Sequence, residues 1–288
     1  VRPASYSRPV FTKEMKITHT ILAPQMSPIH FRLVQQAFLY SGFKFVILPE
    51  VDAAAVDTGL QFVNNDACYP SILVAGQMIA ALKSGLYDLN HVSLLISQTG
   101  GGCRATNYIG FIRRALADAG WAHIPVISLS AQGFEKNPGF KITIPLLIRA
   151  LRSVMIGDLL MRVLYRTRPY EQEKGAANAL YRRYADRIKA ELKHMTGRSY
   201  RNIVRDIVHD FDTLPLIQME KPRIGVVGEI LVKFHPTANN DIVGTIEREG
   251  AECVMPDLMD FFFYSLFDGL YYETSLESNA FNRFKYHA

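Results

Sequence analysis

Two of the three cysteines lie in loops that open helices, and this placement predicts thiolate chemistry. Cys68 lies in VNNDACYP and Cys103 in QTGGGCRATN, each between an extended segment and a helical one. The positive end of a helix dipole favours the thiolate form of a cysteine, which is the form that binds iron. Because no compact CxxC run accompanies them, their spacing alone makes Cys68 and Cys103 candidate metal ligands and no more.

Small and polar residues beside the two cysteines are suited to a cofactor pocket. The glycine run before Cys103 would let the backbone approach a bulky ligand and turn its N–H groups inward. Such N–H groups, together with side-chain donors, can bond to cluster sulfides and tune a redox potential. The candidate cofactor-binding residues are Gly100, Gly101, Gly102, Asn64, Asn65 and Thr106.

Other interpretations of these segments remain open. A lone cysteine is commonly a small buried hydrophobe, and Cys253, which alternates with apolar residues in AECVMP, is predicted to lie in the core. The run GGGC is also compatible with a phosphate loop, although no GKS, GKT or GxGxxG motif accompanies it. His30 and His235 adjoin prolines near strand-to-helix turns and could face a crevice. Without a paired acid or a metal-ligand spacing, we interpret both histidines as surface or capping residues.

An alternation of apolar strands and helical segments must position these loops. Ser27 and Pro28 mark the start of the first helix after a strand, and Gly42 marks its end. This alternation predicts parallel strands in a twisted sheet. Loops at the carboxyl ends of such strands line a ligand crevice, so Cys68 and Cys103 can converge there. Strands are predicted at 16–24, 44–50, 91–97 and 124–130.

The pattern divides the chain into three predicted parts. Residues 1–145 form a Rossmann-like α/β domain that carries both cysteine loops, and residues 146–218 are wholly helical. Residues 219–288 form a second α/β unit, which we expect to be incomplete because it offers only two strands, the first of them at 222–232. The predicted fold class is therefore α/β, with a Rossmann-like parallel-sheet domain, a helical middle segment and a second partial α/β unit.

Composition argues against several classes of protein. The chain has 288 residues, 49% hydrophobic and 20% charged, and its apolar runs fall short of the roughly 20 residues that a membrane span needs. The net charge is +5, but acidic neighbours accompany the basic residues, so we expect no nucleic-acid partner and no membrane. Three cysteines without a leader peptide argue against a disulfide framework and predict a reducing, cytoplasmic location.

Five long segments carry a family resemblance that extends over nearly the whole chain. They are NNDACYPSILVAGQMIAALKSGLYD, LLISQTGGGCRATNYIGFIRRALADAG, PVISLSAQGFEKNPGF, GDLLMRVLYRTRPYE and RIGVVGEILVKFHPTANN. With these motifs the chain resembles the large acyl-CoA dehydratase activase-related proteins of anaerobic bacteria. Those proteins are related to the iron–sulfur subunits of (R)-2-hydroxyacyl-CoA dehydratases.

The resemblance implies a 4Fe-4S cluster that Rossmann-like domains hold through three cysteines. Cys68 and Cys103 match two of the family positions, and the segment with the third has no counterpart here. We therefore expect a cluster site that is incomplete, or that is completed by Cys253, an exogenous ligand or a missing segment. The chain is expected to be a fragment whose partners are the remaining domains of a larger polypeptide, including an actin-like ATPase portion.

The resemblance also implies a function. In the related dehydratases, ATP-driven transfer of a low-potential electron lets a 2-hydroxyacyl-CoA thioester lose water. We expect the chain to be an iron–sulfur component of such an electron-transfer system, with an acyl-CoA as candidate ligand and no activity as an isolated fragment. The alternative is a non-catalytic α/β docking module with an incomplete or vestigial cluster site. A nucleotide-binding Rossmann domain is a weaker third interpretation, because GxGxxG is absent.

Overall fold

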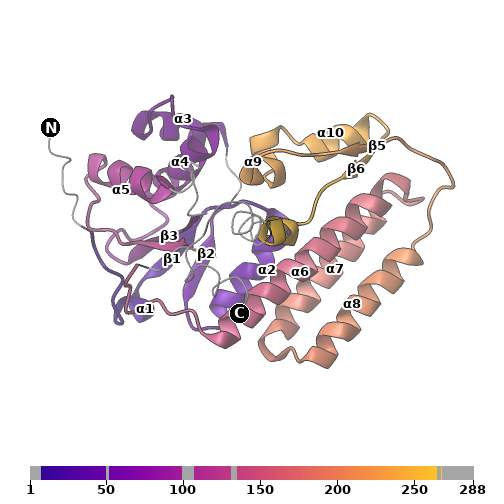
Figure 1. Ribbon diagram of the computed structural model, residues 1–288, viewed down its shortest axis with the longest axis horizontal. Coiled ribbons are helices and arrows are strands. Elements are labelled where there is room, and N and C mark those ends of the chain that lie inside the picture. Colours follow the sequence, from indigo (N-terminus) through magenta and orange to yellow (C-terminus); the bar gives the residue numbers. More distant parts are fainter. Residues whose placement is uncertain (1–7, 50–51, 99–106, 131–134, 265–266, 268–288) are drawn as a thin grey trace, which may run out of the picture.

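The computed structural model describes residues 8–49, 52–98, 107–130, 135–264 and 267 and shows an α/β architecture (Figure 1). Four parallel strands form the main sheet in the spatial order β2-β1-β3-β4. This arrangement confirms the predicted α/β, Rossmann-like class. The strands are β1 (Thr20–Ala23), β2 (Lys44–Ile47), β3 (Val92–Gln98) and β4 (Val126–Ser130).

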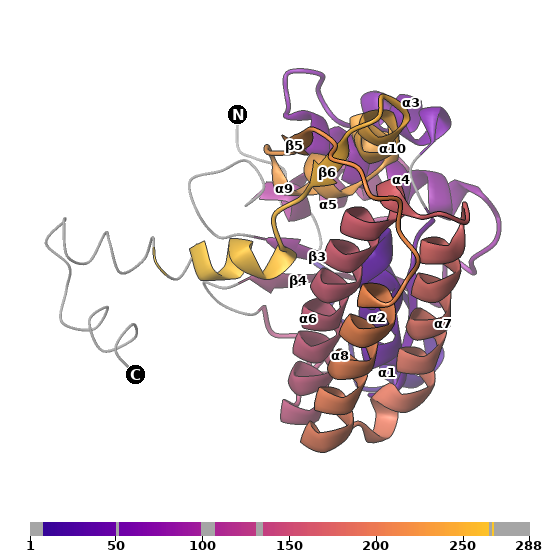
Figure 2. The same cartoon turned by 90° about the vertical axis from the view of Figure 1, so that its right-hand side faces the viewer.

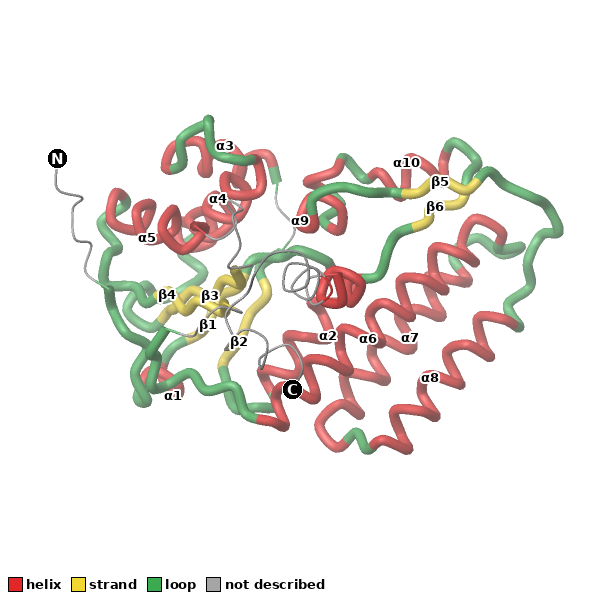
Figure 3. The backbone as a smooth tube through the Cα atoms, viewed as in Figure 1, coloured by secondary structure: helices red, strands yellow, loops and turns green. Residues whose placement is uncertain are grey.

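Helices cover both faces of this sheet (Figure 3). The helices of the first half of the chain are α1 (Met15–Thr18), α2 (Pro28–Leu39), α3 (Ala53–Phe62), α4 (Tyr69–Lys83) and α5 (Tyr108–Asp118). The helices of the middle part are α6 (Ile144–Thr167), η2 (Arg168–Tyr170), α7 (Ala176–Glu191), η3 (Leu192–His194) and α8 (Gly197–Asp212).

Successive strand residues alternate between two hydrophobic layers, as the period of a strand requires. Ile21 and Leu95 pack on the face covered by α2 and α6. Leu22 and Leu94 pack on the opposite face, against α4 and α5. Because both faces are buried, the strands appear in the sequence as continuous apolar runs.

α6 and α7 lie beside α2, and α8 packs on α6 and α7, so that the three long helices extend the first of these layers (Figure 2). α8 shows why they pack: Ile203, Ile207 and Phe211 recur every four residues and are all buried. The hydroxyl of Thr196 begins this helix by accepting the backbone N–H of Ser199 at 3.1 Å. One continuous core therefore runs from the sheet to α8.

A second, smaller sheet follows α8 and lies near the end of α6 (Figure 1). Its two strands, β5 and β6, pair in parallel. A further helix covers 258–264. The elements of this unit are β5 (Arg223–Gly225), α9 (Ile230–Phe234), η4 (Thr237–Asn239), α10 (Ile242–Arg248) and β6 (Glu252–Val254).

Two predicted strands differ from the structure most, because helical residues replace one of their ends. Residues at the start of the predicted strand 16–24 belong to the helical turn α1 instead, so that β1 begins only at Thr20. The strand predicted at 222–232 ends at Gly225, because Gly228 has a φ of +139° and α9 begins at Ile230. In the described part of the chain, no helix combines the length and apolarity needed to cross a membrane.

Candidate functional site

Cys68 stands at the N-cap of α4, as its helix-opening position predicts. Its backbone is extended, and Pro70 occupies the first turn, where its missing N–H costs no helical hydrogen bond. The Cys68 thiol is free and half-buried, and its Sγ lies 2.9 Å from the Oγ of Ser71. A helix N-terminus therefore presents an unbridged sulfur with one polar neighbour.

Close packing of α3 on α4 positions the helix that carries Cys68. A Cβ added to Gly76 would lie 2.0 Å from the carbonyl oxygen of Ala55, and one added to Gly59 would lie 2.3 Å from that of Ile72. Only glycine allows the two backbones to approach so closely. Residues on nearly every side of α4 are buried, so this helix forms part of the core.

Gln77 fixes α4 to the carboxyl ends of two strands. Its side chain is 5% exposed, and its Oε1 accepts the backbone N–H of Gln25 at 3.0 Å. Its Nε2 donates to the carbonyl oxygen of Pro49. Gln25 follows β1 and Pro49 follows β2, so one amide joins the helix to both loops. Gln77 is not among the residues predicted from the sequence, because no local pattern identifies a glutamine that bridges two distant loops.

Cys68 lies at the carboxyl edge of the main sheet, near the point where the strand order reverses. In a parallel sheet, the chain returns from the carboxyl ends of the strands to their amino ends before the next strand begins. α4 makes this return before β3, so Cys68, at the N-terminus of α4, lies beside the carboxyl ends of the strands. β3 ends at Gln98 and pairs with β1 at the point where the strand order reverses. Open α/β sheets bind ligands at this switch point.

Five of the predicted site residues lie outside the described part of the chain. They are Gly100, Gly101, Gly102, Cys103 and Thr106. Asn64 and Asn65 are described and exposed, in the loop before Cys68. The Oδ1 of Asn64 accepts the backbone N–H of Asp66 at 3.0 Å, so this side chain supports its own loop.

Cys253 lies in the core of the second unit, which confirms the prediction. It is 3% exposed within β6 and packs with Ile246 and Ala251. Burial raises the pKa of its thiol to about 11, so that the thiol stays protonated near neutral pH. Among the described residues, no group of three or more His, Cys, Asp or Glu side chains could hold a metal ion.

The interpretation of His30 as a surface or capping residue is wrong, because its side chain is completely buried. Its Nδ1 lies 2.6 Å from the hydroxyl of Ser27, and its Nε2 lies 2.9 Å from a carboxylate oxygen of Asp158 on α6. The order Ser–His–Asp resembles a nucleophilic triad, but Ser27 is only 3% exposed, and a buried hydroxyl does not reach a substrate. The spacing of Ser27 and His30 was visible in the sequence, whereas Asp158 carried no local signal.

His235 is also fully buried, which corrects its assignment to the surface, although it does occupy the C-cap of α9. Its Nδ1 accepts the backbone N–H of Ala238 at 3.3 Å. Burial lowers the pKa of this imidazole, because a low-dielectric environment disfavours the charged form.

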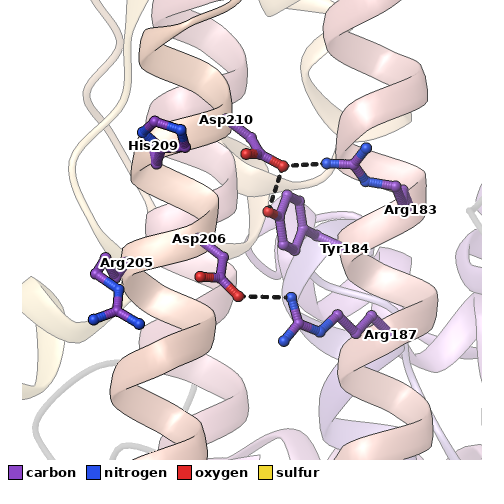
Figure 4. Close-up of a pocket in the computed structure, with 7 residues that line it drawn as sticks. All are labelled: Arg183, Tyr184, Arg187, Arg205, Asp206, His209 and Asp210. Atoms are coloured by element: carbon purple, nitrogen blue, oxygen red, sulfur yellow. Dashed lines mark hydrogen bonds and ion pairs between the residues drawn. The ribbon is translucent and has the colours of Figure 1, made fainter.

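Two concave regions lie away from Cys68. The first, about 500 Å³, is a groove between α7 and α8 (Figure 4). There Arg187 pairs with Asp206 at 2.9 Å, and Asp210 binds Arg183 and the hydroxyl of Tyr184. The carboxylates of Asp206 and Asp210 are both paired with arginines of α7, so the charged groups of the groove hold α7 and α8 together. The second region, about 420 Å³, lies between α6 and the strands β5 and β6.

No known family model matches the chain, and no curated protein is found as a relative.

Proposed function

We propose that the chain is an iron–sulfur component of an ATP-driven, low-potential electron-transfer system of the 2-hydroxyacyl-CoA dehydratase and activase type. Cys68 and Cys103 would supply two of the cluster thiolates. The observation that supports this proposal best is the position of Cys68: a free, half-buried sulfur at a helix N-terminus, on the edge of the sheet from which the Cys103 segment starts. The sequence motifs around both cysteines, which resemble those of the dehydratase and activase-related proteins, also support the proposal.

The described residues are compatible with part of a cluster site. Cys68 is half-buried and its thiol is free, whereas Cys253 is buried in another unit and keeps its proton, so Cys253 does not fit as the third ligand. The remaining cluster ligands would be Cys103 and other groups that lie outside the described part of the chain. A bound cluster of this kind would supply a low-potential electron. The packing of α4 on α3 and the Gln77 bridge would hold Cys68 in place.

Anaerobic reconstitution of the full chain with iron and sulfide tests the proposal. We expect absorption near about 400 nm and bound iron in the unmodified chain. Both signals should fall in Cys68→Ser and Cys103→Ser variants, and they should persist in Cys253→Ala, a matched control that also removes one thiol. Iron uptake that is equal in all four proteins, or absent from the unmodified chain, would contradict the ligand assignment.

An apolar stripe on α6 favours the alternative, a docking module for the ATPase portion of a larger polypeptide, with an acyl-CoA as a further candidate ligand. Ile144, Ile148, Leu151 and Met155 recur at helical spacing and are 75%, 42%, 43% and 47% exposed. Exposed apolar stripes of this kind are suited to protein contacts. Co-purification with the separately produced ATPase portion, and its loss in Leu151→Asp, would support docking. Docking by a chain that takes up no iron would favour this alternative over the cluster proposal.

A further inference from the structure

The cavity between α6 and the second sheet, called here the α6–β6 cavity, has an apolar wall. Met161 lines it from α6, Val226 and Val227 line it from the loop after β5, and Met255 and Pro256 line it from the loop after β6. β5 and β6 are parallel, so both loops leave the carboxyl ends of their strands. These ends are where α/β units generally bind ligands. Cys68 does not line this cavity.

Most of the charges around the cavity are already paired. Arg223 donates from Nε to a carboxylate oxygen of Glu252 at 3.1 Å, and Arg162 forms an ion pair with Asp257. Arg166 also lines the cavity; its side chain is exposed and makes no hydrogen bond or ion pair with the described residues. The charges within each of these ion pairs cancel, and the positive charge of Arg166 is left uncompensated.

The other ionisable groups in the wall add no negative charge. Burial raises the pKa of the Cys253 thiol to about 11 and raises the pKa of the Tyr165 phenol as well, so both groups keep their protons. The hydroxyl of Tyr165 makes no hydrogen bond with the described residues and can donate to a ligand. The cavity thus combines an apolar wall, one uncompensated cation and one neutral donor.

We propose that the α6–β6 cavity binds a small organic anion, whose carboxylate or phosphate group pairs with Arg166 and whose apolar body contacts Met161 and Met255. A guanidinium binds both kinds of oxyanion, and charge-assisted hydrogen bonds are among the stronger polar contacts. The volume of about 420 Å³ is within the range of small-molecule sites. The inference of an anion site does not depend on the proposed function.

Calorimetric titration of the full chain with four probes tests the site. Phenyl phosphate and benzoate carry both the anion and an apolar ring, benzyl alcohol lacks the charge, and inorganic phosphate lacks the ring. We expect at least one of the two ring anions to bind, and both other probes to bind roughly tenfold more weakly or not at all. Which ring anion binds more tightly identifies the preferred oxyanion. Failure of both to bind, or binding of inorganic phosphate as tight as that of phenyl phosphate, would overturn the proposal.

Three variants connect the binding to the named residues. Arg166→Met keeps the aliphatic stem and should weaken binding of the ring anion roughly tenfold, and Tyr165→Phe should weaken it by a smaller factor. Arg201→Met is the matched control, because Arg201 is an exposed arginine on α8 outside the cavity. If Arg166→Met binds like the control, the assignment of the anion to this cavity is wrong.

Discussion

His30 holds its imidazole between the hydroxyl of Ser27 and the carboxylate of Asp158, and no part of its side chain is exposed. The same carboxylate accepts the backbone N–H groups of Leu258 and Met259 at 2.5 and 3.1 Å. These N–H groups begin the helix at 258–264, where a negative charge is favourable. One buried side chain of α6 therefore joins α2 to the end of the second unit.

Removal of the Asp158 carboxylate should be costly. Asp158→Ala leaves a buried imidazole and two backbone donors without their acceptor, so we expect a loss of roughly 3–5 kcal/mol in the free energy of unfolding. Asp186→Ala removes an exposed carboxylate that pairs with Arg32, and it should cost less than about 1 kcal/mol. Urea denaturation of both variants measures the difference. Similar small losses would show that the buried network contributes little.

His235 and His19 should make the chain less stable in acid. Burial lowers the pKa of His235 in the folded chain, so the unfolded chain takes up a proton at higher pH than the folded chain does. The stability contributed by the neutral ring is complete above about pH 6.5, the unfolded pKa, and is lost as the pH falls through the folded pKa. His235→Gln should have a shallower loss of unfolding free energy below about pH 6.5.

In the His235→Gln variant, His19 should still make the free energy of unfolding fall in acid. Burial also lowers the pKa of His19, so its contribution has the same sign. Chemical denaturation at a series of pH values measures the slope, and His19→Gln combined with His235→Gln should reduce it further. A slope that neither substitution changes would place the acid sensitivity in other groups.

At the scale of elements, the contact between α3 and α4 is determined by glycines rather than by large side chains. Gly59 and Gly76 face the backbone of the other helix at distances that leave no room for a Cβ. The close approach of the α3 and α4 backbones packs α3 against the helix that carries Cys68. This close packing adds rigidity to the candidate site.

A methyl group at this contact should separate the helices. In Gly76→Ala the new Cβ would overlap the carbonyl oxygen of Ala55, and we expect a loss of roughly 1–3 kcal/mol. Gly197→Ala is the matched control, because a Cβ there meets no atom within 4 Å. That change should be neutral or slightly stabilising. Thermal unfolding of the two variants measures the contrast, and equal melting temperatures would argue against the close contact.

At the scale of the whole molecule, α6 belongs to both halves. Leu160 is buried in the core shared with the main sheet, and its neighbour Met161 is buried in the core shared with the second unit. A bidentate pair between Arg168 and Glu247, at 2.7 and 2.8 Å, adds a polar link to α10. The second unit therefore depends on the same helix that covers the sheet.

This shared helix predicts cooperative unfolding. The only tryptophan, Trp121, packs against the core of the main sheet, so its fluorescence reports on the first unit. Far-ultraviolet circular dichroism reports on helices throughout the chain. We expect the two signals to give the same transition midpoint in urea, as one cooperative unit requires. Separate midpoints would show that the second unit unfolds independently.

Features that depend on local chain signals could be predicted from the amino-acid sequence. Apolar runs separated by helical segments identified the parallel α/β class, and the loop before Pro70 placed Cys68 at the start of a helix. Alternation with apolar residues correctly placed Cys253 in the core. Each of these signals lies within a few residues of the feature it predicts.

Contacts between residues far apart in the chain could be identified only once the helices and strands were placed in space. The pairing of His30 with Asp158 and the bridge from Gln77 to two strand ends join residues far apart in the chain. Such contacts depend on how helices pack, and the polar side chains that make them look in the sequence like ordinary surface residues. For the same physical reason, the candidate anion cavity appears only when α6 and the strands β5 and β6 lie together.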